Sequence, residues 1–407
     1  MATHVERIVI VGASVAGLSA ADTLREEGYD GSIVVLSAEA VLPYDRPPLS
    51  KQALDPRAAT RDFLLRPEGH YDETRIDLRL DTPATALDTD ASVVRTPSGE
   101  VPYDRVVIAT GSRPKRLFTV AGDPLPNVRT STDCRALRER AASAASAVVV
   151  GTGFIGLEVA ATLCRAGLDV ATVGFYPLPL DRSIGPVIAQ MLRDLHLENG
   201  VAMHAGCTVA SVEEKDGQFR VHLSSGVELE ADMALAGIGA QPNVEWLEGS
   251  GVEVGDGIPV DAWGRTNVPG VLAAGDVAAF DNALAGGQMR IEHWTSAVEQ
   301  GRQVALGILD AATPAFASVP YFWTDQFGCK IQTYGRRRPD DELHVVEGSL
   351  ADRDFVAVHG GSDGAFTAVT ACGRPAAVRP YRALLQSSAT LADALAVTGS
   401  QVLASNR

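Results

Sequence analysis

Two glycine-rich turns contain the residues best suited to ligand chemistry. Residues 12–17 (GASVAG) follow the apolar run 8–11, and residues 151–156 (GTGFIG) follow the apolar run 147–150. A helix-forming stretch comes after each turn, so backbone N–H groups and the positive end of a helix would face a pyrophosphate. The first turn has Ser14 in place of the middle glycine of the dinucleotide fingerprint, whereas the second turn is complete. Two turns of this kind predict two dinucleotide sites.

The strand that follows each turn decides how a ribose would be held. Residues 32–36 have the pattern of a buried strand, and Glu39 is the nearby carboxylate that could bind an adenosine ribose. In the second half, residues 169–173 lead into Gly174, and no adjacent Arg or Lys marks a pocket for a 2′-phosphate. The sequence therefore encodes the choice between NADH and NADPH only weakly.

Three further features could contact a flavin nucleotide. The proline-stiffened segment LPYDRPPLSK offers Arg46 and Lys51 near the first turn, and we favour ligand contact over a plain surface loop. A strand at residues 103–108 leads into the glycine turn at residues 109–111. Asp276, in a Gly-Asp turn after an apolar strand, could accept a hydrogen bond from a ribityl hydroxyl. This arrangement favours a flavin over a nicotinamide, although a bare Gly-Asp turn would be merely structural.

Composition limits the classes of function. The chain has 407 residues, enough for two or three domains, and 46% of them are hydrophobic. Its formal net charge of −16 argues against a nucleic acid or an anionic membrane as a partner. The five cysteines are scattered, without a CxxC redox or zinc motif, and we predict no metal site. Because there is no basic, apolar leader and no long apolar run, we expect a cytoplasmic protein.

The pattern of strands and helices predicts an α/β fold. Each glycine turn lies in a strand–turn–helix–strand unit, so two Rossmann-like dinucleotide-binding domains are expected. From about residue 319, short strand-like segments follow one another and predict an antiparallel sheet. Residues 383–396 have the pattern of a helix that packs against this sheet. Together they would form a C-terminal α+β domain.

The motifs occur in an order that resembles a known family. GASVAGL, LPYDRPPLSK, ATGSRP, VGTGFIGLE, GIGAQPN, AAGD, EHW and YFWTDQFG follow one another over about residues 1–385. This series is similar to that of the FAD-dependent ferredoxin reductases, the NAD(P)H-driven partners of small ferredoxins in bacterial cytochrome P450 and aromatic-ring dioxygenase systems. The resemblance implies a glutathione-reductase-like fold, with an FAD-binding domain (residues 1–114 and 242–318), an NAD(P)H-binding domain (residues 115–241) and a C-terminal domain (residues 319–407).

The resemblance also implies roles for individual residues. FAD would be bound by Gly12, Ser14, Ala16, Gly17, Glu39, Arg46, Lys51, Ala84, Ala109, Thr110, Gly111, Arg113, Asp276, Glu292, His293, Trp294 and Trp323. The nicotinamide nucleotide, NADH in preference to NADPH, would be bound by Gly151, Gly153, Phe154, Ile155, Gly156, Glu158, Gly174, Gly237, Ile238 and Gly239. Lys51 and Glu158 match a pair near the reacting flavin nitrogen, and we predict that they interact. These two residues and Trp323 are the ones expected to act in catalysis.

The cysteines favour release of electrons one at a time. In this fold a disulfide reductase needs a thiol pair over the flavin, and related peroxidases and oxidases need a cysteine in the loop that here reads YDRPP. Neither is present, so electrons that arrive as a hydride would leave singly, to an iron–sulfur ferredoxin. The ferredoxin could dock at Arg336, Arg337 and Arg338, with Arg66, Arg75 and Arg79 as other candidates. A solvated turn explains the three consecutive arginines almost as well.

Two other functions remain open. An apoptosis-inducing-factor-like flavoprotein shares the RPPLSK loop and would act by NADH binding and signalling. The long C-terminal insertion or basic stretches that would mark it are not evident. An NAD(P)H oxidase would differ in letting oxygen outcompete the ferredoxin. Slow flavin reduction, or turnover that is indifferent to a ferredoxin, would favour these alternatives.

Overall fold

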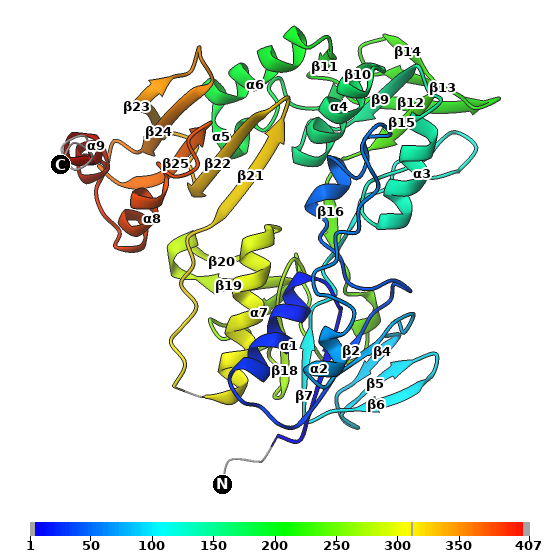
Figure 1. Cartoon of the computed structure of the whole chain (residues 1–407), viewed down its shortest axis with the longest axis vertical. Coiled ribbons are helices and arrows are strands. Elements are labelled where there is room, and N and C mark those ends of the chain that lie inside the picture. The colour runs from blue at the N-terminus through cyan, green and yellow to red at the C-terminus, as the bar shows by residue number, and fades with distance from the viewer. Residues whose placement is uncertain (1–4, 311, 402–407) are drawn as a thin grey trace. The chain divides into compact units, whose positions relative to one another are not determined.

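The computed structural model describes residues 5–310 and 312–401, which form two compact units (Figure 1). The first unit comprises the residues up to Asp45, residues 62–113 and residues 241–321. The second comprises residues 46–61, residues 114–240 and the chain from Phe322 onward. The short strands β8 (Ser112–Pro114) and β16 (Ala240–Pro242) lie where the chain passes from one unit to the other.

A parallel sheet of five strands forms the centre of the first unit. Its strands are β1 (Arg7–Val11), β2 (Ser32–Leu36), β3 (Ile76–Arg79), β7 (Arg105–Ile108) and β18 (Val271–Ala273), in the order β18-β7-β1-β2-β3. Four of the five residues of β1 are buried, as expected for a parallel strand covered on both faces. The helices α1 (Val15–Glu26) and α7 (Trp294–Leu309) lie side by side, and the Ser19 hydroxyl donates to the Val298 carbonyl (Figure 1).

Two smaller sheets complete the first unit. One is antiparallel and contains β4 (Ala86–Asp88), β5 (Val93–Thr96) and β6 (Gly99–Pro102). The other contains β17 (Ile258–Val260), β19 (Ala278–Asn282) and β20 (Gly287–Arg290). The remaining helices here are short: α2 (His70–Glu73) and the 3₁₀ turns η2 (Glu245–Leu247) and η3 (Ala283–Ala285).

The second unit contains a parallel sheet of four strands. Its strands are β9 (Ser146–Val150), β10 (Asp169–Gly174), β11 (Ala202–Ala205) and β15 (Met233–Ala236), in the order β11-β10-β9-β15. Its helices are α3 (Ser131–Ala141), α4 (Phe154–Ala166), α5 (Asp181–Ile184) and α6 (Pro186–Glu198), with the 3₁₀ turn η1 (Pro47–Ser50). An antiparallel sheet adds β12 (Val209–Lys215), β13 (Gln218–Leu223) and β14 (Glu228–Ala231).

The last part of the second unit is a five-stranded sheet. Its strands are β21 (Tyr321–Gln326), β22 (Cys329–Gly335), β23 (Glu342–Ser349), β24 (Asp354–Gly360) and β25 (Phe366–Cys372), in the order β21-β22-β25-β24-β23. The pairs from β22 to β23 are antiparallel, as predicted. Apolar residues of this sheet and of α6, such as Ile331 and Leu192, belong to one buried core.

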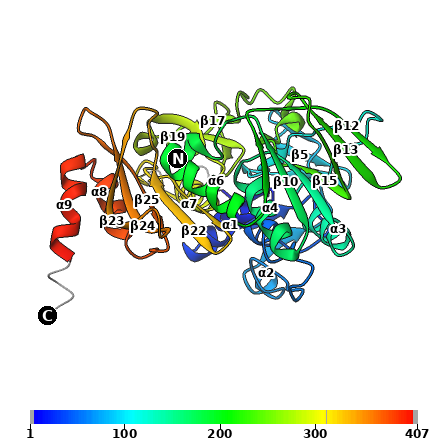
Figure 2. The ribbon, with the colours of Figure 1, turned by 90° about the horizontal axis from the view of Figure 1, so that it is seen from above.

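The prediction of one helix at residues 383–396 is wrong. The chain forms α8 (Arg379–Gln386) and α9 (Leu391–Gln401), which lie beside β23–β25 (Figure 2). Ser388, between the two helices, has a φ of +53°, a conformation that ends a right-handed helix. The predicted fold class is otherwise confirmed. Each glycine turn follows the first strand of a parallel sheet, and the last sheet along the chain has antiparallel pairs.

Candidate functional site

The first glycine turn joins β1 to α1 at the carboxyl edge of the parallel sheet in the first unit. Gly12 has a φ of +115°, and a Cβ there would lie 2.2 Å from the carbonyl oxygen of Ala109, which follows β7. Glycine is therefore required for this approach. Ser14 is the N-cap of α1, but its side chain makes no capping hydrogen bond. The Ser14 side chain therefore does not occupy the first N–H groups of α1, and an anion-binding turn requires such N–H groups.

Predicted FAD residues from three strands meet at this edge. Ala109 follows β7, Asp276 comes soon after β18, and the turn follows β1, which neighbours β7. A Cβ on Gly275 would lie 2.8 Å from the Cβ of Ala16, so the Gly-Asp turn contacts the start of α1. The Ser112 hydroxyl donates to Oδ2 of Asp276 at 3.2 Å. The carboxyl edge of neighbouring parallel strands is where sheets of this class bind ligands.

Other predicted FAD residues in the first unit are bonded to protein groups. Glu39 accepts a hydrogen bond of 2.6 Å from the Tyr44 hydroxyl. Arg113 donates from Nη1 to Oε2 of Glu245 at 2.8 Å, and this bond lowers the pKa of the Glu245 carboxyl. The remaining predicted FAD residues of this unit have other surroundings. Gly17 lies in α1 beside Gly12, and Ala84 packs against the apolar core. The Thr110 hydroxyl donates to the Asn243 carbonyl, and Gly111 is the next residue.

Residues 292–294, at the start of α7, also have protein partners. Glu292 forms an ion pair with Arg290, and Nε1 of Trp294 donates to Oδ1 of Asp45 at 2.7 Å. Burial lowers the pKa of His293 to about 4, so this imidazole is neutral at pH 7. The segment therefore has a neutral imidazole between two side chains, Glu292 and Trp294, that are bonded within the protein.

The second glycine turn repeats the geometry of the first. Gly151 has a φ of +117°, and a Cβ there would lie 2.2 Å from the carbonyl oxygen of Gly237, which follows β15. A Cβ on Gly156 would lie 2.0 Å from the carbonyl oxygen of Gly151. Gly153 is the N-cap of α4, and a Cβ there would have no heavy atom within 4 Å among the described residues. The turn is closed on its sheet side and open at Gly153, as a pyrophosphate cradle requires.

The predicted contact between Lys51 and Glu158 is confirmed. Glu158 lies on α4 with 3% of its surface exposed, and Nζ of Lys51 is 2.6 Å from its Oε2. The Ser50 hydroxyl donates to the same oxygen at 2.6 Å, and the Thr324 hydroxyl donates to Oε1 at 2.8 Å. A buried carboxylate is stable only when it is paired and hydrogen-bonded, and three donors meet that requirement here.

A chain of buried side chains extends from Thr324. Nε2 of Gln326 donates to the Thr324 hydroxyl at 2.9 Å, and Oε1 of Gln326 is 2.7 Å from Nε2 of His196. A carboxylate can only accept, so the Thr324 hydroxyl donates to Glu158 and accepts from Nε2 of Gln326. Oε1 of Gln326 can also only accept, so His196 must carry its proton on Nε2. Burial lowers the pKa of His196, which keeps the ring neutral. Sequence reasoning missed Ser50, Thr324, Gln326 and His196.

Replacing Thr324 with valine tests this chain of hydrogen bonds. Valine has the same shape but no hydroxyl, so it leaves Oε1 of Glu158 and Nε2 of Gln326 without their partner in a buried site. We expect the free energy of unfolding to fall by about 1–3 kcal/mol. Thr324→Ser keeps the hydroxyl and should retain most of that stability in urea unfolding. Equal losses in the two variants would contradict the role of the hydroxyl.

The other residues predicted in the second unit have mixed surroundings. The ring of Phe154 packs against Phe322 with centroids 4.9 Å apart, so it belongs partly to the core. Ile155 on α4 and Ile238 after β15 are both exposed. Gly239 follows Ile238, and Gly174 ends β10. Arg46 donates from Nη1 to the carbonyl of Arg129 at 2.6 Å, and Trp323 lies half-buried in β21. Arg46, Lys51 and Trp323 thus belong to the second unit, unlike the other predicted FAD residues.

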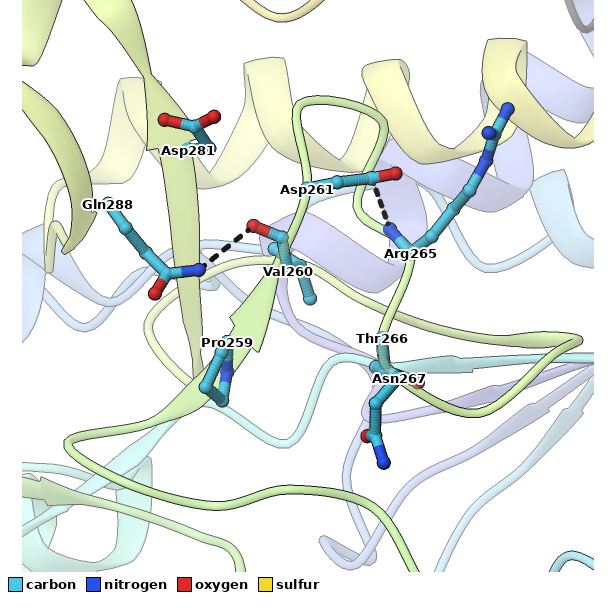
Figure 3. Close-up of a pocket in the computed structure, with 8 residues that line it drawn as sticks. All are labelled: Pro259, Val260, Asp261, Arg265, Thr266, Asn267, Asp281 and Gln288. Atoms are coloured by element: carbon cyan, nitrogen blue, oxygen red, sulfur yellow. Dashed lines mark hydrogen bonds between the residues drawn. The ribbon is translucent and has the colours of Figure 1, made fainter.

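A shallow hollow of about 520 Å³ lies elsewhere in the first unit, and no predicted site residue lines it (Figure 3). Two of its polar side chains are used by the fold: Oδ1 of Asp261 accepts from the backbone of Arg265, and Gln288 donates to the Val260 carbonyl. We therefore assign it no ligand. Within residues 5–310 and 312–401, no cluster of three His, Cys, Asp or Glu side chains could hold a metal ion. No helix in that part of the chain is both long and apolar enough to span a bilayer.

Comparison with known proteins identifies the family. Residues 6–301 match the family described as pyridine nucleotide-disulphide oxidoreductase, and residues 321–405 match the reductase C-terminal family. Rhodocoxin reductase of Rhodococcus erythropolis is 37% identical over 84% of this chain and 81% of its own length. The ferredoxin–NAD(+) reductase component of the anthranilate 1,2-dioxygenase system of Burkholderia cepacia is 35% identical over 94% of each chain.

The fold agrees with a solved structure of the same kind. The ferredoxin reductase for the CYP199A2 system of Rhodopseudomonas palustris superimposes with a TM-score of 0.89, at 32% identity, over 95% of this chain and 96% of that one. The chain therefore belongs to the pyridine nucleotide-disulphide oxidoreductase family, among the ferredoxin–NAD(+) reductases, and is an oxidoreductase.

Proposed function

We propose that this chain is a flavoprotein ferredoxin reductase that takes electrons from NADH through FAD and passes them, one at a time, to a [2Fe–2S] or similar ferredoxin. The ferredoxin would serve a cytochrome P450 or a ring-hydroxylating oxygenase, as the names of the relatives suggest. The observation that carries the proposal is the pair of dinucleotide turns of the same build, one in each unit. NADPH is the other possible electron donor.

The carboxyl edge of the first unit fits FAD. The turn at residues 12–17 offers the start of α1 to a pyrophosphate, and Asp276 offers a carboxylate to ribityl hydroxyl groups. When bound, FAD would supply the chemistry, which is to accept a hydride and give up its electrons singly. The protein would orient the cofactor and exclude water. The other FAD contacts named from the sequence are part of this proposal.

The second unit would bind the nicotinamide coenzyme at the turn of residues 151–156. Lys51 would present a fixed positive charge to the flavin, because Glu158 holds its ammonium group in a buried ion pair. Trp323 would supply an aromatic face beside the flavin. In this proposal Glu158 acts through Lys51, so it is a positioning residue.

The cysteines support electron release without a disulfide step. All five are in the second unit, and none is in the YDRPP loop. Cys329 and Cys372 interact with each other, but both are buried in the core that α6 shares with the C-terminal sheet. A buried pair of this kind is packed into the core and is not presented to a substrate.

The domain boundaries and the location are also proposals. We propose an FAD-binding domain at residues 1–114 and 242–318, an NAD(P)H-binding domain at residues 115–241 and a C-terminal domain at residues 319–407. The five cysteines, none of them in a disulfide, support a reducing compartment, and we propose the cytoplasm.

Docking of the ferredoxin is proposed at the arginines that follow β22. Arg338 forms ion pairs with Asp341 and Asp363, so its charge is largely balanced. Arg336 is exposed, and the side chain of Arg337 lies against Gly185. Because the whole chain is acidic, an acidic ferredoxin would need a local basic patch. Arg336 is therefore the best candidate for its centre, with Arg66, Arg75 and Arg79 as the alternatives.

Reversing the charge of Arg336 tests this surface. We expect Arg336→Glu to raise the KM for the ferredoxin several-fold at low ionic strength, because it replaces attraction with repulsion. Reduction of the flavin by NADH should not change. At about 0.5 M salt the KM difference should largely disappear, because exposed charges are screened. An unchanged KM at low salt would place docking elsewhere.

The proposed function is tested by rapid mixing of the purified flavoprotein with NADH. We expect fast bleaching of the flavin, followed by reduction of cytochrome c that depends on an added iron–sulfur ferredoxin. Slow bleaching would point to an NADH-binding signalling protein. Fast bleaching followed by oxygen consumption that a ferredoxin does not change would point to an oxidase. Either result would overturn the proposal that this chain is a ferredoxin reductase.

A further inference from the structure

We infer that the coenzyme site of the second unit does not discriminate against a 2′-phosphate, so that NADPH serves this chain about as well as NADH. The inference rests on the proposed function and names the coenzymes that its second turn accepts. In sheets of this class, a carboxylate after the second strand accepts a hydrogen bond from the ribose 2′-hydroxyl and repels a 2′-phosphate. Here that strand is β10, and it ends at Gly174.

The side chain of Thr152 crowds the position where a side chain at residue 174 would begin. A Cβ built on Gly174 would lie 2.5 Å from Oγ1 and 2.8 Å from Cγ2 of Thr152. Thr152 is the second residue of the GTGFIG turn, so its side chain occupies the space in which a residue-174 side chain would begin. Gly174 does not have a positive φ, and its backbone therefore does not require glycine. The end of β10 therefore lacks the carboxylate that would select NADH.

The two halves of the chain differ at corresponding positions. The Gly12 N–H donates to the Leu36 carbonyl, and the Gly151 N–H donates to the Val173 carbonyl, both at 2.8 Å. Glu39 lies three residues after Leu36, and Tyr176 lies three residues after Val173. Tyr176 therefore occupies the position in the second half that corresponds to Glu39 in the first. The carboxylate of the first half is thus replaced by a phenol.

A cation lies beside that phenol. Nη1 of Arg182 donates to the Tyr176 hydroxyl at 3.3 Å, and both side chains are exposed. Asp181 is the one acid between Gly174 and Arg182 in the sequence, and it begins the short helix α5. A guanidinium is the group that accommodates a 2′-phosphate in sites of this class. The second half therefore has a possible phosphate partner where the first half has a carboxylate.

The first test compares the two coenzymes on the purified holoenzyme. We expect kcat/KM for flavin reduction by NADPH to lie within about tenfold of that for NADH, a difference below about 1.4 kcal/mol. Adenosine 2′,5′-bisphosphate should compete with the coenzyme at least as well as 5′-AMP, which measures binding without turnover. A preference for NADH above tenfold would overturn the inference. If neither coenzyme reduces the flavin, the proposed function fails instead.

Variants assign the effect to residues. Arg182→Gln should lower the ratio of NADPH to NADH efficiency by about tenfold, as expected for one lost charge-assisted contact. Arg135→Gln, an exposed arginine on α3, is the matched control and should leave the ratio unchanged. Gly174→Glu with Thr152→Ala should turn the site strongly toward NADH, because alanine leaves only a Cβ, 3.2 Å from the new Cβ. A ratio that Arg182→Gln does not move would overturn the role of Arg182.

Discussion

Replacing Lys51 with methionine is expected to slow reduction of the flavin by NADH about a hundredfold, the usual effect of removing a fixed electrostatic group from a reacting centre. Glu158 is expected to lose its only cationic partner among the described residues, since Nζ of Lys51 is 2.6 Å from its Oε2. Removing one partner of a buried pair typically costs about 3–5 kcal/mol of stability. Ser50 and Thr324 still donate to the carboxylate, so we expect a loss near 3 kcal/mol in urea unfolding.

A second substitution separates stability from rate. In Lys51→Met with Glu158→Gln, the buried charge is gone, so most of the lost stability should return. Flavin reduction should stay slow, because the positive charge is still absent. Lys51→Arg keeps the charge and should retain more of the rate than the methionine variant. A wild-type rate in Lys51→Met would show that the ion pair is structural only.

The glycine turns could be predicted because their geometry is set locally. Gly12 and Gly17 are five residues apart, and a Cβ on Gly17 would meet the carbonyl of Gly12 at 1.9 Å. The same spacing in residues 151–156 gives the same contact. A strand, a turn and a helix in immediate succession leave few ways to fold, so the spacing of the glycines was enough to predict the turn.

The network around Glu158 could not be predicted from local pattern. Thr324 lies 166 residues from Glu158, and His196 lies 130 residues from Gln326. The pair of Lys51 and Glu158 was named only through the family resemblance. One signal was present in β21, where Phe322, Thr324 and Gln326 alternate on a buried face. Polar residues on a buried face of a strand need buried partners, and this could have directed a search for them.

The break between α8 and α9 has a physical reason that is visible in the sequence. The break between α8 and α9 is followed by Thr390 and Asp393, and each side chain accepts from the backbone N–H of the other. A threonine followed three residues later by an acid is a helix-start signal, so the sequence itself indicates a new helix at this point. Glu39 and Arg113 stay predicted ligand contacts, and each also bonds to a protein side chain, that of Tyr44 or Glu245. The partner of Arg113 lies 132 residues away, so local pattern could not have predicted that bond.

Gly153 offers the sharpest test of the second turn. Its φ is −79°, and a Cβ there would meet no described atom within 4 Å, so the fold itself accepts a side chain at this N-cap. Aspartate is among the best N-cap residues, because it accepts from the first N–H groups of the helix. Gly153→Asp should therefore leave the free energy of unfolding unchanged or raise it by up to about 1 kcal/mol.

The same substitution should prevent coenzyme binding. The carboxylate would occupy the N–H groups that bind a pyrophosphate and would repel its charge, which is worth several kcal/mol. We expect the KM for NADH to rise at least about a hundredfold, measured as flavin reduction against NADH concentration. Gly153→Ser is the matched control, because the first turn already has Ser14 at the corresponding N-cap, and its KM should stay close to that of the natural chain. If the aspartate variant binds NADH normally, the pyrophosphate does not lie at the start of α4, and the second turn only joins β9 to its helix.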